Sequence, residues 1–464
     1  MGEPSPLESA GEGPLCRLHI GGRVARIEQA FALRRQKVMA AITPGVMVLF
    51  SAPVTYRNND VEQEYRQDSD FFYLLGFEEP ESVLVIVAGE SNRVILFLRN
   101  RDAVRETWDG VRLGVEAAVE TLGVDEAYPI AELATKLKEI LAGKEHLYYA
   151  LGHDGARDQL VLSTLQALRS EIRRGGSWPM SITEPGKIIH EMRLFKDDTE
   201  IAALRRAIEI TDQAHRRVMQ AAHPGSWEFE LEAVLRAEFR RQGSPRVSYS
   251  PIVASGMNST VLHHRSNDRK SLSGELVLVD AGCEFGYQSS DITRTFPVDG
   301  KFTPIQRCAY ELVLNAQERA IDVVRPGATV DEIHDLTVRV LVQGLLSLGI
   351  LQGSLETIVE TGSYKKYYMH RTSHWLGMDV HDVGRYHLAG VPRPLQPGML
   401  LTIEPGLYFP PGDPEVPEGL RGCGIRIEDD VLVTSDSQVN LSLSIPKAVD
   451  DIEALMSQSE SAQR

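Results

Sequence analysis

The sequence has few cysteines, no long apolar segment and fewer basic than acidic residues. Four cysteines (Cys16, Cys283, Cys308 and Cys423) occur in 464 residues, and none forms a CxxC pair. That usage favours free thiols in a reducing compartment, so we predict a cytoplasmic protein. No run of about 18 apolar residues is present, so we expect no membrane partner. The net charge of −16 argues against a nucleic-acid partner, because phosphate binding needs a basic surface patch.

Common catalytic motifs are also missing. The chain contains no GxxxxGKS/T phosphate loop, no HExxH zinc motif and no GxSxG nucleophile elbow. The first residues are acidic and rich in Pro, Gly and Ser, and they lack the basic and apolar stretches of a signal peptide. We therefore expect a short disordered leader over residues 1–15.

The length and the order of local patterns predict two domains. A chain of 464 residues exceeds what one hydrophobic core usually supports. Its first part mixes helical and strand patterns and ends in a Gly- and Pro-rich passage, which is typical of a domain boundary. Just beyond, Asp197 and Glu200 have capping-box spacing, which predicts the start of a new helix. The predicted domains are 16–183 and 184–464, the predicted helices of the first are 27–41 and 130–142, and its predicted strands are 46–50, 82–87 and 93–97.

The second domain contains a faint internal repeat. Segment 274–282 has a turn glycine, an apolar strand pattern, Asp280 and a further glycine, and segment 398–406 repeats this order with Glu404 at the carboxylate position. The two carboxylates are 124 residues apart (404 − 280), as are the first glycines (398 − 274). A duplicated helix–helix–strand–strand unit would bring equivalent carboxylates together across a pseudo-twofold axis.

Asp280 and Asp291 are predicted to lie on a β-hairpin. Asp280 ends an apolar strand pattern, where an unpaired buried charge would be costly. Asp291 follows eleven residues later, after a turn with Gly and Ser, so paired strands would place both carboxylates side by side. Two such groups repel each other unless one is protonated or a cation is shared. The alternative is one aspartate that caps a turn and one that pairs with Arg294.

Glu404 and Glu428 also belong to strand patterns. Glu404 ends an apolar run and precedes Pro-Gly. Arg426, Glu428 and Asp430 alternate with apolar residues, so strand periodicity puts their side chains on one face. That face is either the solvated side of an edge strand or the inner wall of a site that collects carboxylates and a guanidinium.

Three of the thirteen histidines lie within twelve residues, namely His370, His374 and His381. A single histidine is more often a surface or core residue than part of a site. Three of them beside Trp and Gly, in a histidine-poor chain, favour a site. His263 stands before the first carboxylate of the repeat much as this cluster stands before the second, which makes it a further candidate.

Four carboxylates and one imidazole would form a mostly oxygen ligand set. Such a set suits Mn²⁺, Co²⁺, Zn²⁺ or Fe²⁺ better than a structural zinc site built from thiolates. Two divalent ions in one site can generate hydroxide at neutral pH and polarise a carbonyl group. This combination indicates amide hydrolysis.

Five ordered motifs contain these candidates: VDAG (279–282), SDITRTF (290–296), SHWLGMDVHD (373–382), TIEPGLY (402–408) and GIRIEDD (424–430). Two earlier segments, YRQDSDFFYLLGFEEPE (65–81) and ETWDGVRLG (106–114), belong to the same pattern. Together they resemble the pita-bread metallopeptidases, specifically the bacterial aminopeptidase P (Xaa-Pro aminopeptidase) branch. The resemblance covers nearly the whole chain after the leader. It implies an α+β protein with a small N-terminal α/β domain and a C-terminal pita-bread domain, a pseudo-twofold duplicated α-α-β-β fold.

The resemblance also implies the ligands of two divalent metal ions, with Mn²⁺ preferred and Co²⁺, Zn²⁺ or Fe²⁺ as alternatives. Asp280 would bind one ion through both oxygens. Asp291 and Glu428 would bridge the two ions, and His374 and Glu404 would complete the shell of the other. A metal-bridging hydroxide would attack the carbonyl of the residue before proline, and Glu404 would help to manage its proton.

Other residues would serve the substrate. His370 and His381 would stabilise the substrate and the tetrahedral intermediate by hydrogen bonds. His263 would contact the substrate near the scissile bond, Arg426 would fix the carboxylates of the site, and Tyr408 would line the pocket.

The implied reaction releases the N-terminal residue from peptides with proline in the second position. Trp108 would be lent to the active site of a neighbouring subunit, which implies a homodimer or homotetramer. The alternative reaction is that of prolidase, a dipeptidase with the same ligands. A third possibility, a binding module without catalysis, is disfavoured because such relatives typically lose metal ligands.

The sequence departs from the family pattern at Arg371, where relatives usually have glycine. The arginine either crowds the pocket or contacts the substrate backbone.

Overall fold

The computed structural model describes residues 24–42 and 44–460, so the predicted leader lies outside the described residues. The chain divides into an N-terminal unit, Met1–Met192, and a C-terminal unit, Arg193–Arg464. The division falls within helix α7 (Gly186–Leu194). Among the described helices, none combines the length and the apolar content that crossing a bilayer requires.

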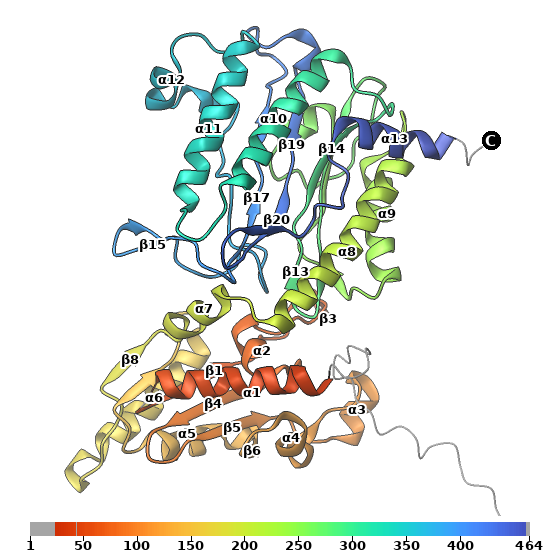
Figure 1. The fold of residues 1–464 in the computed structure, drawn as a ribbon. Coiled ribbons are helices and arrows are strands. Elements are labelled where there is room, and N and C mark those ends of the chain that lie inside the picture. The colour runs from red at the N-terminus through yellow and green to blue at the C-terminus, as the bar shows by residue number, and fades with distance from the viewer. Residues whose placement is uncertain (1–23, 43, 461–464) are drawn as a thin grey trace, which may run out of the picture. The chain divides into compact units, whose positions relative to one another are not determined.

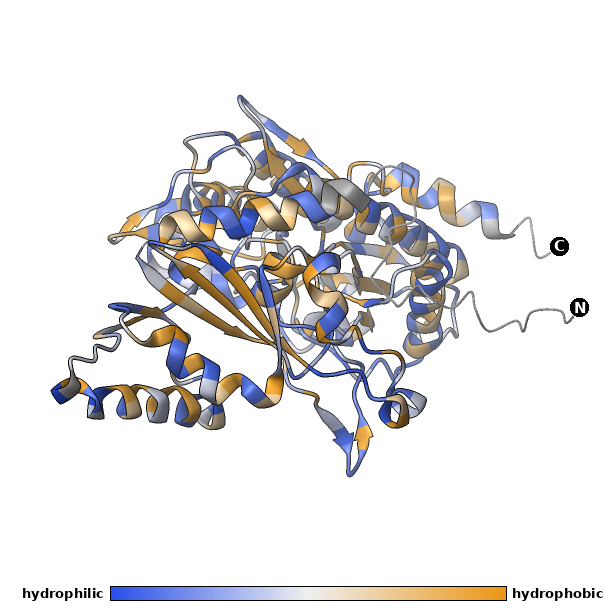
Figure 2. Ribbon diagram, turned by 90° about the horizontal axis from the view of Figure 1, so that it is seen from below, coloured by the Kyte–Doolittle hydropathy of each residue, from blue (hydrophilic) through white to orange (hydrophobic). Residues whose placement is uncertain are grey.

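The N-terminal unit is built on a six-stranded mixed sheet with the order β6-β5-β4-β1-β7-β8. The strands β1, β4 and β5 pair in antiparallel fashion, whereas β6, β7 and β8 join by parallel pairing. The sequences GVMVLF and VLVIVA of β1 and β4 are buried at nearly every position, as expected for strands covered on both faces. Figure 2 colours much of this sheet as hydrophobic. The bounds are β1 Gly45–Phe50, β4 Val83–Ala88, β5 Arg93–Leu98, β6 Glu126–Pro129, β7 His146–Tyr148 and β8 Ser181–Thr183.

Helices complete the N-terminal unit, and the core forms where α5 and α6 cover the sheet. Leu137 and Leu141 of α5 and Val161 of α6 belong to one cluster with β1, β4 and β5. The predicted helices and strands of this unit are confirmed, except that the second helix begins with a 3₁₀ turn at 130–132. The bounds are α1 Val24–Ala41, α2 Ser69–Leu75, α3 Ala103–Asp109, α4 Gly114–Leu122, α5 Leu133–Leu141 and α6 Gly155–Ser170.

Two helix pairs enclose the strands of the C-terminal unit, α8 with α9 and α10 with α11 (Figure 1). The first helix begins where the sequence predicts it: the Asp197 carboxylate accepts from the backbone of Glu200, whose side chain accepts from the backbone of Asp197. The bounds are α8 Asp198–Ala221, α9 Glu228–Arg241, α10 Pro304–Asp322, α11 Val330–Ser347, α12 Leu355–Thr361 and α13 Val449–Glu460.

Each helix pair is followed by its own antiparallel strands. Three-stranded sheets have the orders β10-β11-β14 and β17-β20-β21, and β18 pairs with β19. The order helix, helix, strand, strand therefore occurs twice, in agreement with the repeat seen in the sequence. The bounds are β10 Ile252–Ser255, β11 Leu276–Asp280, β14 Thr293–Pro297, β17 Leu400–Ile403, β18 Gly406–Tyr408, β19 Gly424–Arg426, β20 Asp429–Val433 and β21 Gln438–Asn440.

The strand registers bring the candidate carboxylates to matching positions. Asp280 at the end of β11 lies opposite Thr293 of β14, two residues after Asp291. Ile403 at the end of β17 lies opposite Asp429 of β20, so Glu404 and Glu428 flank this pair. Both halves of the duplicated unit thus carry acidic residues where their apolar strands end.

Candidate metal centre

Four carboxylates and one imidazole of the C-terminal unit converge in one cluster. His374 Nε2 lies 3.4 Å from Asp291 Oδ2 and 3.5 Å from Glu404 Oε1. Ligand atoms of Asp291, His374 and Glu428 all lie within 4.8 Å of one another. Strand ends and adjoining loops supply these groups, and their side chains are buried or half-buried. Such spacing allows the atoms to share a cation.

Tyr249 joins the first aspartate to this group. Its hydroxyl contacts Asp280 Oδ1 and lies 2.5 Å from Asp291 Oδ1. The predicted hairpin is therefore confirmed, because β11 and β14 pair and place both carboxylates around one hydroxyl proton. The alternative, in which one of the two aspartates pairs with Arg294, is wrong, since the Arg294 guanidinium lies 2.7 Å from Asp429.

The polar face that carries Arg426 and Glu428 points inward. Arg426 donates to Asp280 Oδ2 at 2.6 Å and to the Tyr408 hydroxyl at 2.8 Å. Thr293 Oγ1 donates to Glu428 Oε2 at 2.7 Å. Because Arg426 and Glu428 are 4% and 2% exposed, the interpretation as a solvated edge strand is wrong.

Burial and mutual repulsion disfavour the ionised carboxylates. Burial and the charges of Asp291, Glu404 and Asp280 raise the pKa of Glu428 well above its usual value. Burial also raises the pKa of Glu404 to about 7 and raises that of Asp291. Burial opposes a charged His374, but the hydrogen bond to Asp291 and the charge of Glu404 outweigh it and raise its pKa to about 9. The cluster thus holds more negative charge than Arg426 compensates, and a mostly oxygen donor set of this charge fits divalent cations.

The other two histidines of the cluster flank the carboxylates. The His374 and His381 rings lie 4.4 Å apart, nearly perpendicular. Burial and the charge of His374 lower the pKa of His381, and the charge of His263 contributes in the same direction. His263 therefore lies within electrostatic range of His381. His370, the remaining histidine of the cluster at 370–381, places its Nδ1 3.8 Å from Glu404 Oε2.

Hydrogen bonds constrain the orientation of His370. Its Nδ1 lies 2.8 Å from the backbone carbonyl of Arg371, so this nitrogen carries a proton. Burial and the charge of Arg426 lower the pKa of His370 to about 3, so the ring is neutral and Nε2 accepts from Tyr408, 2.9 Å away. Tyr408 in turn accepts from Arg426. The hydrogen-bonded chain Arg426–Tyr408–His370 thus links the Asp280 carboxylate to the His370 imidazole.

Arg371 pairs with a residue of α11, and Trp108 is exposed on the N-terminal unit. The Arg371 side chain is 56% exposed and pairs with Asp331 of α11, whose other oxygen lies 2.9 Å from His387 Nε2. The substitution therefore creates a surface ion pair and leaves the five candidate ligands intact. Trp108 is on α3 of the N-terminal unit, where it is 82% exposed.

Sequence reasoning missed two contributors to the cluster. Tyr249 had no signal, because a tyrosine in a Ser- and Pro-rich segment is common in loops. Thr293 did have one, since it lies two residues after Asp291 in an extended segment and therefore shares its side. Asp430 was assigned only to the inward face; its Oδ2 accepts from the Asp291 backbone at 3.3 Å, and burial and the charge of Asp291 raise its pKa.

Comparisons with known proteins agree with this geometry. Metallopeptidase family M24 matches residues 202–435, and the N-terminal domain of aminopeptidase P matches residues 31–148. The Xaa-Pro aminopeptidase of Escherichia coli (strain K12) is 45% identical over 92% of this chain and 97% of its own length. Among solved structures, Pseudomonas aeruginosa aminopeptidase PepP superimposes with a TM-score of 0.92 at 43% identity, covering 94% of this chain and 99% of that one. Zinc-substituted E. coli aminopeptidase P in complex with product has a TM-score of 0.91 at 44% identity, covering 93% and 98%.

The chain therefore belongs to metallopeptidase family M24, and it is a hydrolase with the pita-bread fold that the sequence predicts. Its similarity extends through both units, so within this family it belongs to the Xaa-Pro aminopeptidases of the aminopeptidase P type.

Proposed function

We propose that the buried cluster is the site where this Xaa-Pro aminopeptidase removes the residue that precedes proline. The observation that carries the proposal is the concentration of Asp280, Asp291, Glu404 and Glu428 around His374, with Arg426 as their guanidinium partner. Carboxylates so arranged repel one another, and shared divalent cations would remove that repulsion.

Two divalent ions, Mn²⁺ first among them, are proposed to occupy the cluster. Asp280 would hold one ion, and His374 and Glu404 the other. Asp291 suits a place between them, because it contacts the same hydroxyl as Asp280 and lies 3.4 Å from His374. Glu428, with Asp291, would bind both ions. When bound, such ions supply hydroxide at neutral pH and polarise the scissile carbonyl.

The protein's own side chains would handle protons and orient the peptide. Glu404, whose pKa lies near 7 without metal, is suited to exchange a proton with the nucleophile. His263, His370 and His381 would contact the substrate, and Tyr408 would line its pocket. An X–Pro bond has no amide hydrogen and a fixed φ, so an apolar slot without a hydrogen-bond acceptor would favour proline.

The experiment compares hydrolysis of Arg-Pro-Pro and Gly-Pro by chelator-treated protein with and without Mn²⁺. We expect Mn²⁺-dependent release of arginine from the tripeptide. The variant Glu404→Ala should lose more than about a hundredfold in activity, because residues that merely orient ligands already cost 10–100-fold. Glu415→Ala, which removes an exposed glutamate of the same unit, is the matched control and should keep full activity.

Two outcomes would change the assignment. Cleavage confined to Gly-Pro would indicate prolidase, and full activity of Glu404→Ala would place the chemistry elsewhere. Parallel assays with Co²⁺, Zn²⁺ and Fe²⁺ rank the metals, and Xaa-Ala peptides hydrolysed as fast as Xaa-Pro peptides would contradict the proposed basis of specificity.

We also propose that the chain forms a homodimer or homotetramer in which Trp108 reaches a neighbouring active site. Trp108 is 82% exposed, and Val104 and Val111 beside it are 74% and 56% exposed, which is typical of a surface that another chain covers. Sedimentation of the purified protein as a monomer would contradict this proposal. The location in the cytoplasm and the domain boundary at residues 183–184 stay predictions from the sequence.

A further inference from the structure

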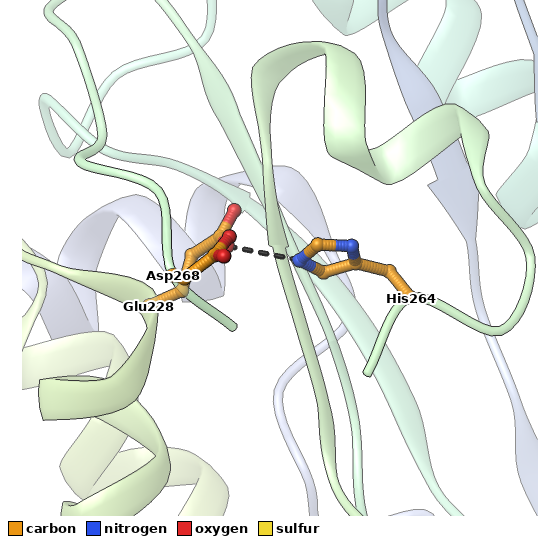
Figure 3. Close-up of side chains that lie close together, drawn as sticks. All are labelled: Glu228, His264 and Asp268. Atoms are coloured by element: carbon orange, nitrogen blue, oxygen red, sulfur yellow. Dashed lines mark hydrogen bonds and ion pairs between the residues drawn. The ribbon is translucent and has the colours of Figure 1, made fainter. Parts of the chain in front are cut away.

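A second group of potential ligands lies outside the metal centre. Glu228, the first residue of α9, approaches His264 and Asp268 of the loop that follows the 3₁₀ helix η3 (Gly256–Thr260), with ligand atoms within 4.8 Å of one another. Figure 3 shows the imidazole of His264 directed at the two carboxylates, with the contact to Glu228 marked. Glu228 and His264 are buried, whereas Asp268 is exposed. None of the roles above uses these residues.

Hydrogen bonds already surround the Glu228 carboxylate. Its Oε1 accepts from the Ser255 amide at 2.6 Å, from the Ser255 hydroxyl at 2.8 Å and from Asn258 at 3.1 Å. Its Oε2 accepts from the Arg269 amide at 3.1 Å and lies 3.0 Å from His264 Nε2. These partners come from both ends of the loop, so the carboxylate is the anchor of the loop. A cation would have to displace several of them.

The chain beyond His264 is held equally firmly. Asn267 has a positive φ of 45°, a strained conformation that its side chain stabilises. That side chain accepts from the Val253 amide at 3.1 Å and donates to Glu232 at 2.7 Å and to the Pro251 carbonyl at 2.9 Å. The residues after His263 are therefore fixed to β10 and α9.

The residues on either side of His263 are both held by neighbouring elements. Leu262 packs against a cluster that contains Tyr408, the hydrogen-bond partner of His370, and apolar residues of β10 and β11. His264 turns to Glu228 and is buried, while His263 between them is exposed. His263 lies within electrostatic range of His381 of the metal centre. Residues 261–264 form a turn closed by the hydrogen bond from the His264 amide to the Val261 carbonyl, so the contacts of Leu262 and His264 set the position of His263 between them.

We propose that Glu228 and His264 are positioning residues, whose hydrogen bond holds His263 toward the bound peptide. The proposal rests on the proposed function, in which His263 contacts the substrate near the scissile bond. Glu228 and His264 do not themselves touch substrate or metal. Their contribution is to restrict one side chain of the active site to a productive orientation.

The test combines substitutions at His263 and His264 in the Mn²⁺-loaded protein with Arg-Pro-Pro as substrate. His264→Leu removes the hydrogen bond to Glu228 and should lower kcat/KM by roughly tenfold to a hundredfold. His264→Gln can still donate to Glu228 and should stay within about threefold of the parent. In the His263→Ala background, His264→Leu should cause no further loss, because interacting residues are not additive. His223→Gln, at an exposed histidine of the same unit, is the matched control and should leave kcat/KM unchanged.

Four results would overturn the proposal: an unchanged kcat/KM for His264→Leu, a wild-type rate for His263→Ala, losses that add fully in the double variant, or failure of His264→Gln to rescue. Bound Mn²⁺ per chain is measured for every variant and should not change. Loss of one equivalent in His264→Leu would assign this cluster to a cation and overturn the proposal as well. A failure of the proposed function is separate, since it is read from Glu404→Ala and from metal-free protein.

Discussion

Glu428 and Asp429 are neighbours in the chain and both are buried, yet the protein treats their charges in opposite ways. Asp429 accepts from Arg294, Lys447, Asn440 and Ser442 at 2.7–2.9 Å. Burial opposes its ionisation, but the charges of Arg294 and Lys447 outweigh that effect and lower its pKa. Glu428 instead faces other carboxylates, and burial and their charges raise its pKa.

The difference separates a structural charge from a functional one. A buried carboxylate with a complete set of donors needs nothing from outside the chain. A carboxylate surrounded by other carboxylates is repelled by them until one of the groups is protonated or a cation binds. Alternation along the extended backbone assigns the roles, because Glu428, just before β20, and Asp429, its first residue, point to opposite sides. Two consecutive residues therefore differ in role: Glu428 belongs to the candidate metal centre, and Asp429 belongs to a structural ion-pair network.

The largest effect on stability is expected from a substitution of the structural carboxylate, Asp429. Asp429→Asn keeps the shape but removes the charge that balances Arg294, whose side chain is fully buried. We expect the free energy of unfolding to fall by about 3–5 kcal/mol, because the partner charge stays buried without compensation. Chemical denaturation of the chelator-treated protein measures the change.

The neighbouring substitution Glu428→Gln is the matched comparison. In chelator-treated protein it removes a carboxylate from a repelling cluster, so the free energy of unfolding should not fall. With Mn²⁺ present, the same variant should lose the stabilisation that metal gives to the parent. Equal destabilisation by both substitutions without metal would show that the two carboxylates have the same role.

The sequence predicts the parts of this comparison that depend on strand alternation. It places Arg426 and Glu428 on one face and Asp280 beside Asp291 on a hairpin, and both predictions are confirmed. It could not assign Arg294 to Asp429, because their 135 residues of separation carry no periodic signal. Tyr249 was missed for the same reason, since only the folded loop brings its hydroxyl to both aspartates.

The sequence also predicts hydrogen bonds at helix ends only where the partners are close together in the chain. The capping box at Asp197 is confirmed because its donors and acceptors lie within one turn. The anchor made by Glu228 has no such signal, because its partners come from loops up to 41 residues further along. Local hydrogen bonds are legible in a sequence, whereas those that close a tertiary loop are not.

A smaller effect is expected on the pH dependence of stability, which should differ in sign between the metal-centre residues and Asp429. In metal-free protein Glu404 keeps a proton up to about pH 7, whereas the unfolded chain releases it near 4.5. The folded state then binds more protons, so stability should fall as pH rises from 5 to 7, by up to about 1.4 kcal/mol per pH unit from this group. His374, with its pKa raised to about 9, adds a loss of the same sign above pH 6.5. Asp429 has the opposite sign, because its lowered pKa costs stability only when pH falls below its usual value of 3.8.

Denaturation midpoints at pH 5, 6 and 7, with chelator and with Mn²⁺, test this pH dependence. The decline should occur only with chelator, since bound cations take the place of the protons. Glu404→Gln should flatten the decline in chelator-treated protein, while Glu415→Gln at an exposed position should leave it unchanged. Stability that rises from pH 5 to pH 7 without metal would mean that the cluster satisfies its own charges, as Asp429 does, and would remove the electrostatic reason for a metal centre.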